Sequence, residues 1–167
     1  MARGSVLPSV LFFAASAASA SAAIECRQEN AIYGDRDGAY ELRFEAVDSE
    51  AANSSYQLRV SVKNTGIELT GFVMETEPVN RPSGILFHDC PDGDTTGEEI
   101  ARCTVWQGVI YSANEGRIDL LPVAGAPAAR DILLPGLALS LLDSTAWGDG
   151  KATVVPWDVL SLKGCRT

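Results

Sequence analysis

The sequence contains one histidine, His88, and lacks the short motifs that usually carry catalysis. A single imidazole excludes zinc sites built from several histidines and the helical His-Glu-x-x-His arrangement. No Gly-x-Ser-x-Gly sequence presents a nucleophile, and no Gly-x-Gly-x-x-Gly or Walker loop is available for phosphates. We therefore expect no catalytic residue, no metal and no cofactor, and a non-enzymatic role is favoured.

Basic residues are also few, since the chain has 13 Lys and Arg against 22 Asp and Glu. Loss of Arg3 with an export signal leaves a net charge of −10. Such a charge opposes binding to nucleic acid and to anionic membrane surfaces, and it favours a cationic protein or peptide as partner. Solubility alone is the alternative reason for the acidity. No apolar run after the N-terminus is long enough to span a membrane.

The N-terminus predicts export. Arg3 precedes an apolar stretch over 6–18 and the small residues of 20–22, which is typical of a signal peptide with its cleavage site. We expect cleavage after Ala22 or Ala23. Residues 1–23 are then the signal peptide, and residues 24–167 form a single disulfide-stabilised β domain.

All four cysteines lie after this cleavage site. An even number of cysteines in an exported chain indicates two disulfides, and the sequence leaves three pairings open. We favour Cys90 with Cys103, because the polar segment 91–102 between two apolar runs can return the chain to its start. Cys26 with Cys165 follows by elimination. The paired Cys-x-x-Cys spacing that is usual in zinc sites is absent.

Alternating apolar and polar residues predict antiparallel strands. Strands are expected over 40–46, 56–63, 67–70, 84–88, 104–111 and 152–162. After Gly71 the large residues Phe72 and Met74 take the positions that were polar before it. This change predicts a β-bulge or a strand that crosses between sheets.

One segment has helical spacing instead. Residues 135–142 begin with Pro135, carry leucines three and four positions apart and precede Gly148, a stop signal. We expect a short helix that covers one mouth of the sheet. The predicted fold is mainly β, an antiparallel β-sandwich or rolled barrel with one short helix and two disulfides.

Two polar segments are able to contact a partner. Segment 75–84 combines acidic residues with one arginine and with two prolines that stiffen the loop. Segment 89–99 carries five carboxylates, which suggests calcium, but Cys103 stands where an EF-hand has its bidentate glutamate. We favour a solvated acidic turn over a calcium site. The candidate interaction residues are Glu75, Glu77, Arg81, Asp92, Asp94, Glu98 and Glu99.

In the segments 71–82, 103–108 and 156–159, the chain resembles uncharacterised periplasmic proteins of alphaproteobacteria. The resemblance covers most of the chain after residue 23 and implies a periplasmic location, without an activity, a cofactor or a site residue. The small acidic lysozyme inhibitors of the periplasm are similar in size, export and disulfides, but their inhibitory motifs are not matched.

These observations predict a periplasmic, non-enzymatic binding or envelope-associated protein. The alternatives are an acidic inhibitor-like protein that recognises a cationic partner and a hydrolase that uses carboxylates. A deep pocket with two nearby carboxyl groups favours the hydrolase. A surface without such a pocket favours protein recognition.

Overall fold

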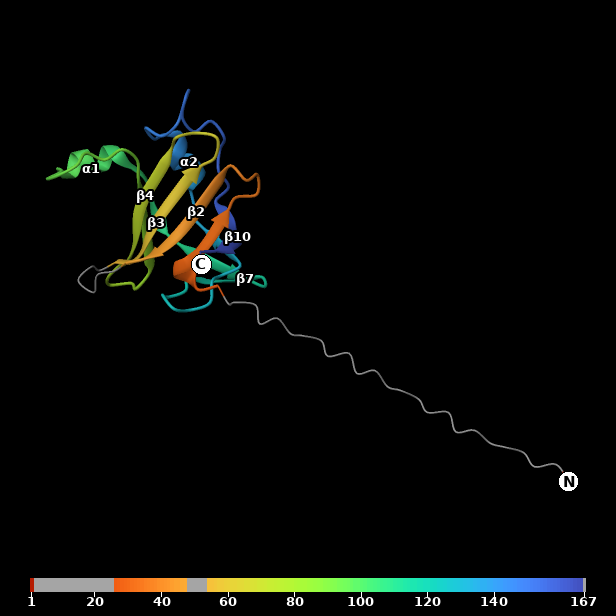
Figure 1. Cartoon of the computed structure of the whole chain (residues 1–167). Helices are drawn as coiled ribbons and strands as arrows, with labels where there is room; N and C mark the ends of the chain where they lie inside the picture. Colours follow the sequence, from red (N-terminus) through yellow and green to blue (C-terminus); the bar gives the residue numbers. More distant parts are fainter. Residues whose placement is uncertain (2–25, 48–53, 167) are drawn as a thin grey trace.

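The computed structural model describes Met1 and residues 26–47 and 54–166 (Figure 1). Ten strands form in these ranges: β1 (Ala31–Gly34), β2 (Tyr40–Ala46), β3 (Ser54–Val62), β4 (Glu68–Glu75), β5 (Pro82–Phe87), β6 (Thr104–Val109), β7 (Tyr111–Asn114), β8 (Arg117–Leu120), β9 (Asp131–Leu133) and β10 (Val159–Cys165). The helices are α1 (Gly97–Cys103), α2 (Leu137–Leu142) and a 3₁₀ turn at Gln28–Asn30. Apart from Met1, the predicted signal peptide and its cleavage site lie outside the described residues.

All ten strands belong to one sheet with the order β6-β5-β4-β3-β2-β1-β10-β9-β7-β8, and neighbouring strands are antiparallel throughout. β6 stands first and β7 ninth in this order, yet only Ile110 separates them along the chain. The sheet must therefore curl until its sides meet, so that one bent strand pairs with β5 and then with β9. The predicted mainly β fold is confirmed, in its rolled form.

The core follows from the alternation in β2 and β3, where every second residue is buried. Tyr33 of β1, Phe44 of β2 and Tyr56 of β3 meet edge to face, with ring centroids 5.7 and 5.3 Å apart. The Tyr33 hydroxyl donates a hydrogen bond to the Ala129 carbonyl at 2.9 Å. Burial nevertheless raises the pKa of Tyr33 to about 12, because the phenolate would lose its hydration.

The alternation continues through β4 without a slip. Gly71 and Val73 are buried, Phe72 and Met74 are exposed, and the register to β3 and β5 is continuous at Gly71. The predicted bulge or crossing at Gly71 is therefore wrong. Gly71 is an inward position where a Cβ would collide with the Ile85 carbonyl, so only glycine permits this close approach. Phe72 and Met74 are outward residues of a regular strand.

The strand predicted over 152–162 begins only at Val159, so its first half is wrong. The preceding Asp158 has another role, since its carboxylate accepts hydrogen bonds from the Gly136 and Ala138 N–H groups at 2.7 and 3.1 Å. These bonds satisfy backbone donors at the start of α2, as a capping side chain does. The predicted helix is present, but it begins two residues later than expected.

Both predicted disulfides are confirmed, with Cα atoms 5.6 Å apart in Cys26–Cys165 and 5.2 Å apart in Cys90–Cys103. Ala31 of β1 is the register partner of Cys165 in β10, so the first disulfide reinforces a strand pair that joins the ends of the domain. The second disulfide closes the connection that contains α1.

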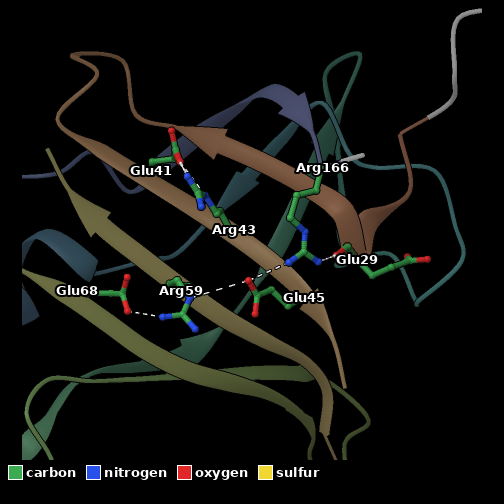
Figure 2. A network of polar contacts seen from close by, with 7 residues as sticks. All are labelled: Glu29, Glu41, Arg43, Glu45, Arg59, Glu68 and Arg166. Carbon is green, nitrogen blue, oxygen red and sulfur yellow. Dashed lines mark hydrogen bonds and ion pairs between the residues drawn. The ribbon is translucent and has the colours of Figure 1, made fainter. Parts of the chain in front are cut away.

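The outer face of β2, β3 and the start of β4 is charged (Figure 2). Arg59 at its centre pairs with Glu45 at 3.9 Å and with Glu68, and Arg166 shares Glu45 at 3.0 Å. The side chains in ion pairs on this face are Glu41, Arg43, Glu45, Arg59, Glu68 and Arg166. Positive and negative groups are equal in number, so this face is electrically balanced.

Candidate functional site

One end of the rolled sheet carries both α-helices. Because neighbouring strands are antiparallel, the connections 35–39, 63–67, 88–103 and 134–158 all lie at this end, which we call the helix-bearing end. These connections contain ten acidic and four basic residues. The helix-bearing end is therefore strongly negative, in contrast to the balanced face of Figure 2.

α1 stands away from the strands at this end (Figure 1). Thr96 caps the helix, since its hydroxyl accepts from the Glu99 N–H and the Glu99 carboxylate accepts from the Thr96 N–H at 2.8 Å. The Thr96 N–H favours the charged carboxylate, which holds the pKa of Glu99 below its usual range. The sequence prediction missed α1, although Thr96-x-x-Glu99 is a recognisable helix start. At its last residue, Cys103, the disulfide ties α1 back to Cys90.

A groove lies between α1 and the sheet. Its larger part has a volume of about 760 Å³, and its walls include Glu68, Thr70, Phe87, Asp89, Ile100 and Lys151. A smaller part of about 310 Å³ shares His88, Asp89 and Lys151 with the larger one. Apolar side chains from β5 and α1 thus face carboxylates within one continuous groove. Such a lining suits a side chain that has an apolar stem and a cationic head.

His88 is the buried residue that lines both parts of the groove. Its Nδ1 lies 3.3 Å from Thr145 Oγ1, and its Nε2 lies 3.6 Å from Asp89 Oδ2. A hydroxyl, an imidazole and a carboxylate in this order can transfer protons in enzymes. Here the second distance exceeds a hydrogen bond and the Asp89 side chain is 88% exposed, so the carboxylate does not orient the ring. His88 instead joins the end of β5 to segment 134–158.

The seven interaction residues predicted from the sequence separate into two groups. Asp92, Asp94, Glu98 and Glu99 lie at the helix-bearing end, whereas Glu75, Glu77 and Arg81 lie at and after the end of β4, at the opposite end of the sheet. β5, a strand of 6 residues, spans the distance between the two groups. At the usual rise of a strand this distance is about 20 Å. The two groups therefore do not form one loop surface.

Comparison with known proteins adds no family to this picture. No family model, curated protein or solved structure matches the chain. The resemblance to periplasmic proteins of alphaproteobacteria stays a prediction. Function is therefore argued from the surface of the molecule.

The acidic segment 89–99 does not gather its carboxylates around one point. Within residues 26–47 and 54–166, no three His, Cys, Asp or Glu side chains come together as a metal site. Glu99 is engaged with Thr96, and Asp89 is the residue beside His88. In the same described ranges, no helix is long and apolar enough to cross a membrane.

A second hollow, of about 500 Å³, lies between α2 and the segment 155–158. Trp157 lines it and is 42% exposed. The Arg36 guanidinium lies 3.8 Å from the centroid of the indole ring, and the indole N–H donates to Asp37 at 2.7 Å. This hydrogen bond lowers the pKa of Asp37. Trp157 is thus engaged by side chains of its own domain.

Proposed function

We propose that this protein is an exported, non-enzymatic binding protein of the bacterial periplasm that recognises a cationic protein or peptide at its helix-bearing end. The uneven distribution of charge carries the proposal. Acidic residues are in excess where the groove opens, whereas the arginines of the strand face are paired with glutamates. A concentrated negative potential attracts a cationic partner and orients it toward the groove.

Two features support export as part of this proposal. The N-terminal sequence has the charged, apolar and small-residue regions of a signal peptide. The two disulfides join all four cysteines, which fits an oxidising compartment such as the periplasm.

Binding is favoured over catalysis by the surroundings of the groove. His88 is held by Thr145 and not by a buried carboxylate, so no ordered proton relay includes it. The groove walls instead combine apolar side chains with the carboxylates of Glu68, Asp89 and Glu99 and with the cations of Arg102 and Lys151, an arrangement that suits side-chain recognition. A hydrolase based on two carboxylates stays an alternative prediction.

Capture from the native cell envelope tests the proposal. The mature protein is immobilised and exposed to envelope extract at ionic strengths of about 0.05 M and about 0.5 M. Asp92→Lys with Asp94→Lys reverses charge at the helix-bearing end. Glu115→Lys in the turn between β7 and β8, with Asp119→Lys in β8, makes the same charge change and is the matched control.

We expect a cationic partner that is retained at low salt, released at high salt, lost by the Asp92 and Asp94 variant and kept by the control. A partner that both variants lose equally is recognised by net charge alone, and the helix-bearing end is then not its site. Capture that neither substitution nor salt affects contradicts electrostatic recognition altogether.

A further inference from the structure

Part of the outer face of β4 and β5, with Val109 of β6, is apolar. Phe72 and Met74 of β4 are 41% and 36% exposed, and they lie on the same face as Ile85 and Phe87 of β5 and Val109 of β6. Phe72 is the register partner of Ile85, and Met74 and Val109 both pair with Ser83 between them. Phe72, Met74, Ile85 and Phe87 are neighbours on β4 and β5, and Val109 lies across Ser83 from Met74; we call these five residues the apolar band.

The apolar band contrasts with the rest of the same sheet. A sheet face that meets water normally carries polar residues. β2 and β3 follow this rule with residues such as Glu41, Arg43 and Arg59, and β4 follows it as far as Thr70. Beyond Thr70 the outward positions turn apolar, although the strand geometry is unchanged. Phe72 and Met74 are the exposed members of the band, and Ile85, Phe87 and Val109 are half-buried beside them. Exposed apolar side chains that gather in this way mark interaction surfaces.

Carboxylates border the apolar band at both ends of β5. At the helix-bearing end, Phe87 and Asp89 line the same groove. The connection that follows Phe87 contains five acidic residues and one arginine, Arg102. At the opposite end, Glu75 and Glu77 are exposed next to Met74 along the chain, together with the single cation Arg81, so carboxylates are in excess there as well. The two groups of interaction residues predicted from the sequence are thus the two borders of one apolar surface.

Like charge argues against two other occupants of this surface. A second copy of the chain would bring acidic borders against acidic borders if the two bands met. An anionic bilayer surface would be repelled in the same way. A partner with an apolar centre and positive charges at its ends is not repelled by the acidic borders.

We propose that the apolar band binds a cationic amphipathic segment of the partner, and this inference rests on the proposed function. The segment must reach from Glu75 and Glu77 to the acidic residues after Phe87, a distance of about 20 Å along β5. A helix of about 13 residues has this length. Its apolar face covers Phe72 and Ile85, while its lysines or arginines meet the acidic borders.

Three synthetic peptides of about 14 residues test the inference. The first contains leucine and lysine placed so that the leucines form one helical face, the second scrambles the same composition, and the third replaces leucine by serine. Isothermal titration measures their binding to the mature protein. We expect the first peptide to bind about tenfold more tightly than the second, and the third to bind weakest and to be released first by salt.

Matched variants locate the binding surface. Phe72→Ser and Ile85→Thr remove apolar area from the band at positions that face outward, so the fold is retained. Ile118→Ser removes an apolar side chain that is 67% exposed on β8 and is the control. We expect each substitution in the band to weaken the amphipathic peptide about fivefold or more, with no change in the control.

The outcomes separate this inference from the proposed function. If all three peptides bind equally and only Asp92→Lys with Asp94→Lys weakens them, cationic recognition stands and the apolar band is wrong. If no cationic peptide binds, the proposed function fails as well. Self-association of the free protein that Phe72→Ser abolishes, seen by sedimentation, assigns the band to a second copy and overturns the inference.

Discussion

Removal of the Cys26–Cys165 disulfide is expected to cost more stability than removal of Cys90–Cys103. The two bridges close loops with sequence separations of 139 and 13 residues. On the chain-entropy account, a bridge stabilises by restricting the unfolded chain, and the restriction grows with the logarithm of loop length. The expected losses are about 5 kcal/mol for the long loop and about 3 kcal/mol for the short one.

The native contacts around the terminal disulfide support its replacement by two serines without loss of the fold. β1 and β10 remain paired, and the Arg166 N–H donates to the Asn30 carbonyl at 2.7 Å beyond the bridge. The Cys26→Ser, Cys165→Ser variant therefore keeps its native contacts and loses mainly the constraint on the unfolded state.

Urea unfolding followed by the fluorescence of the buried Trp106 measures both losses. With a slope of about 2 kcal/mol per molar urea, the midpoint falls by about 2.5 M without the long-loop bridge and by about 1.5 M without the short-loop bridge. Because loss of a bridge relaxes the unfolded chain, the slope is measured for each variant separately and the extrapolated free energies of unfolding in water are compared. A larger fall without Cys90–Cys103 than without Cys26–Cys165 would refute the reasoning.

Further predictions concern single residues. Gly71→Ala should lower the free energy of unfolding by about 3 kcal/mol, because its Cβ meets a backbone carbonyl, whereas Gly66→Ala, with open space around it, should change little in the same urea assay. The raised pKa of Tyr33 means that the unfolded chain loses its proton first, so stability present below pH 10 should fall between about pH 10 and 12 in alkaline melts. Thr96→Ala removes the hydroxyl that donates to Glu99 Oε2 at 2.8 Å and keeps the backbone N–H donor, so the pKa of Glu99 should rise only part of the way toward the ordinary glutamate value in a carboxyl NMR titration, and a pKa that does not rise contradicts the hydroxyl contact. The stability that this carboxylate contributes is present above the ordinary pKa and is lost as pH falls through the lowered one.

Local patterns in the sequence predicted β2 to β6 and both disulfides, but they predicted no strand at β1, β8 or β9. Alternation in β2 and β3 reflects one buried face, and four cysteines allow only three pairings. The bulge or crossing predicted at Gly71 is absent because Phe72 and Met74 are apolar residues at outward positions, so their size does not mark a change of face. Glycine is required at position 71 because the Ile85 carbonyl of the neighbouring strand lies too close for a Cβ atom. The sequence around Gly71 does not show this contact.

The candidate site was predicted only in part, for a related reason. The acidic residues of both connections are visible in the sequence, but their positions at the two ends of β5 depend on how the strands pair. The apolar band joins residues from three strands, so no single stretch of sequence displays it. The sequence signal for the apolar band was the pair Phe72 and Met74, but in the sequence pattern these residues were interpreted as a change of sheet face.

Mapping the bound amphipathic peptide by NMR tests the central claim most directly. Amide signals of the isotope-labelled mature protein are followed while the leucine–lysine peptide is added. The account predicts shifts concentrated in Thr70–Glu75 of β4, in Ser83–Phe87 of β5 and in the segment 89–99, with little change in β1 and β10. Shifts confined to the charged face of β2 and β3, or to the hollow beside Trp157, would contradict it.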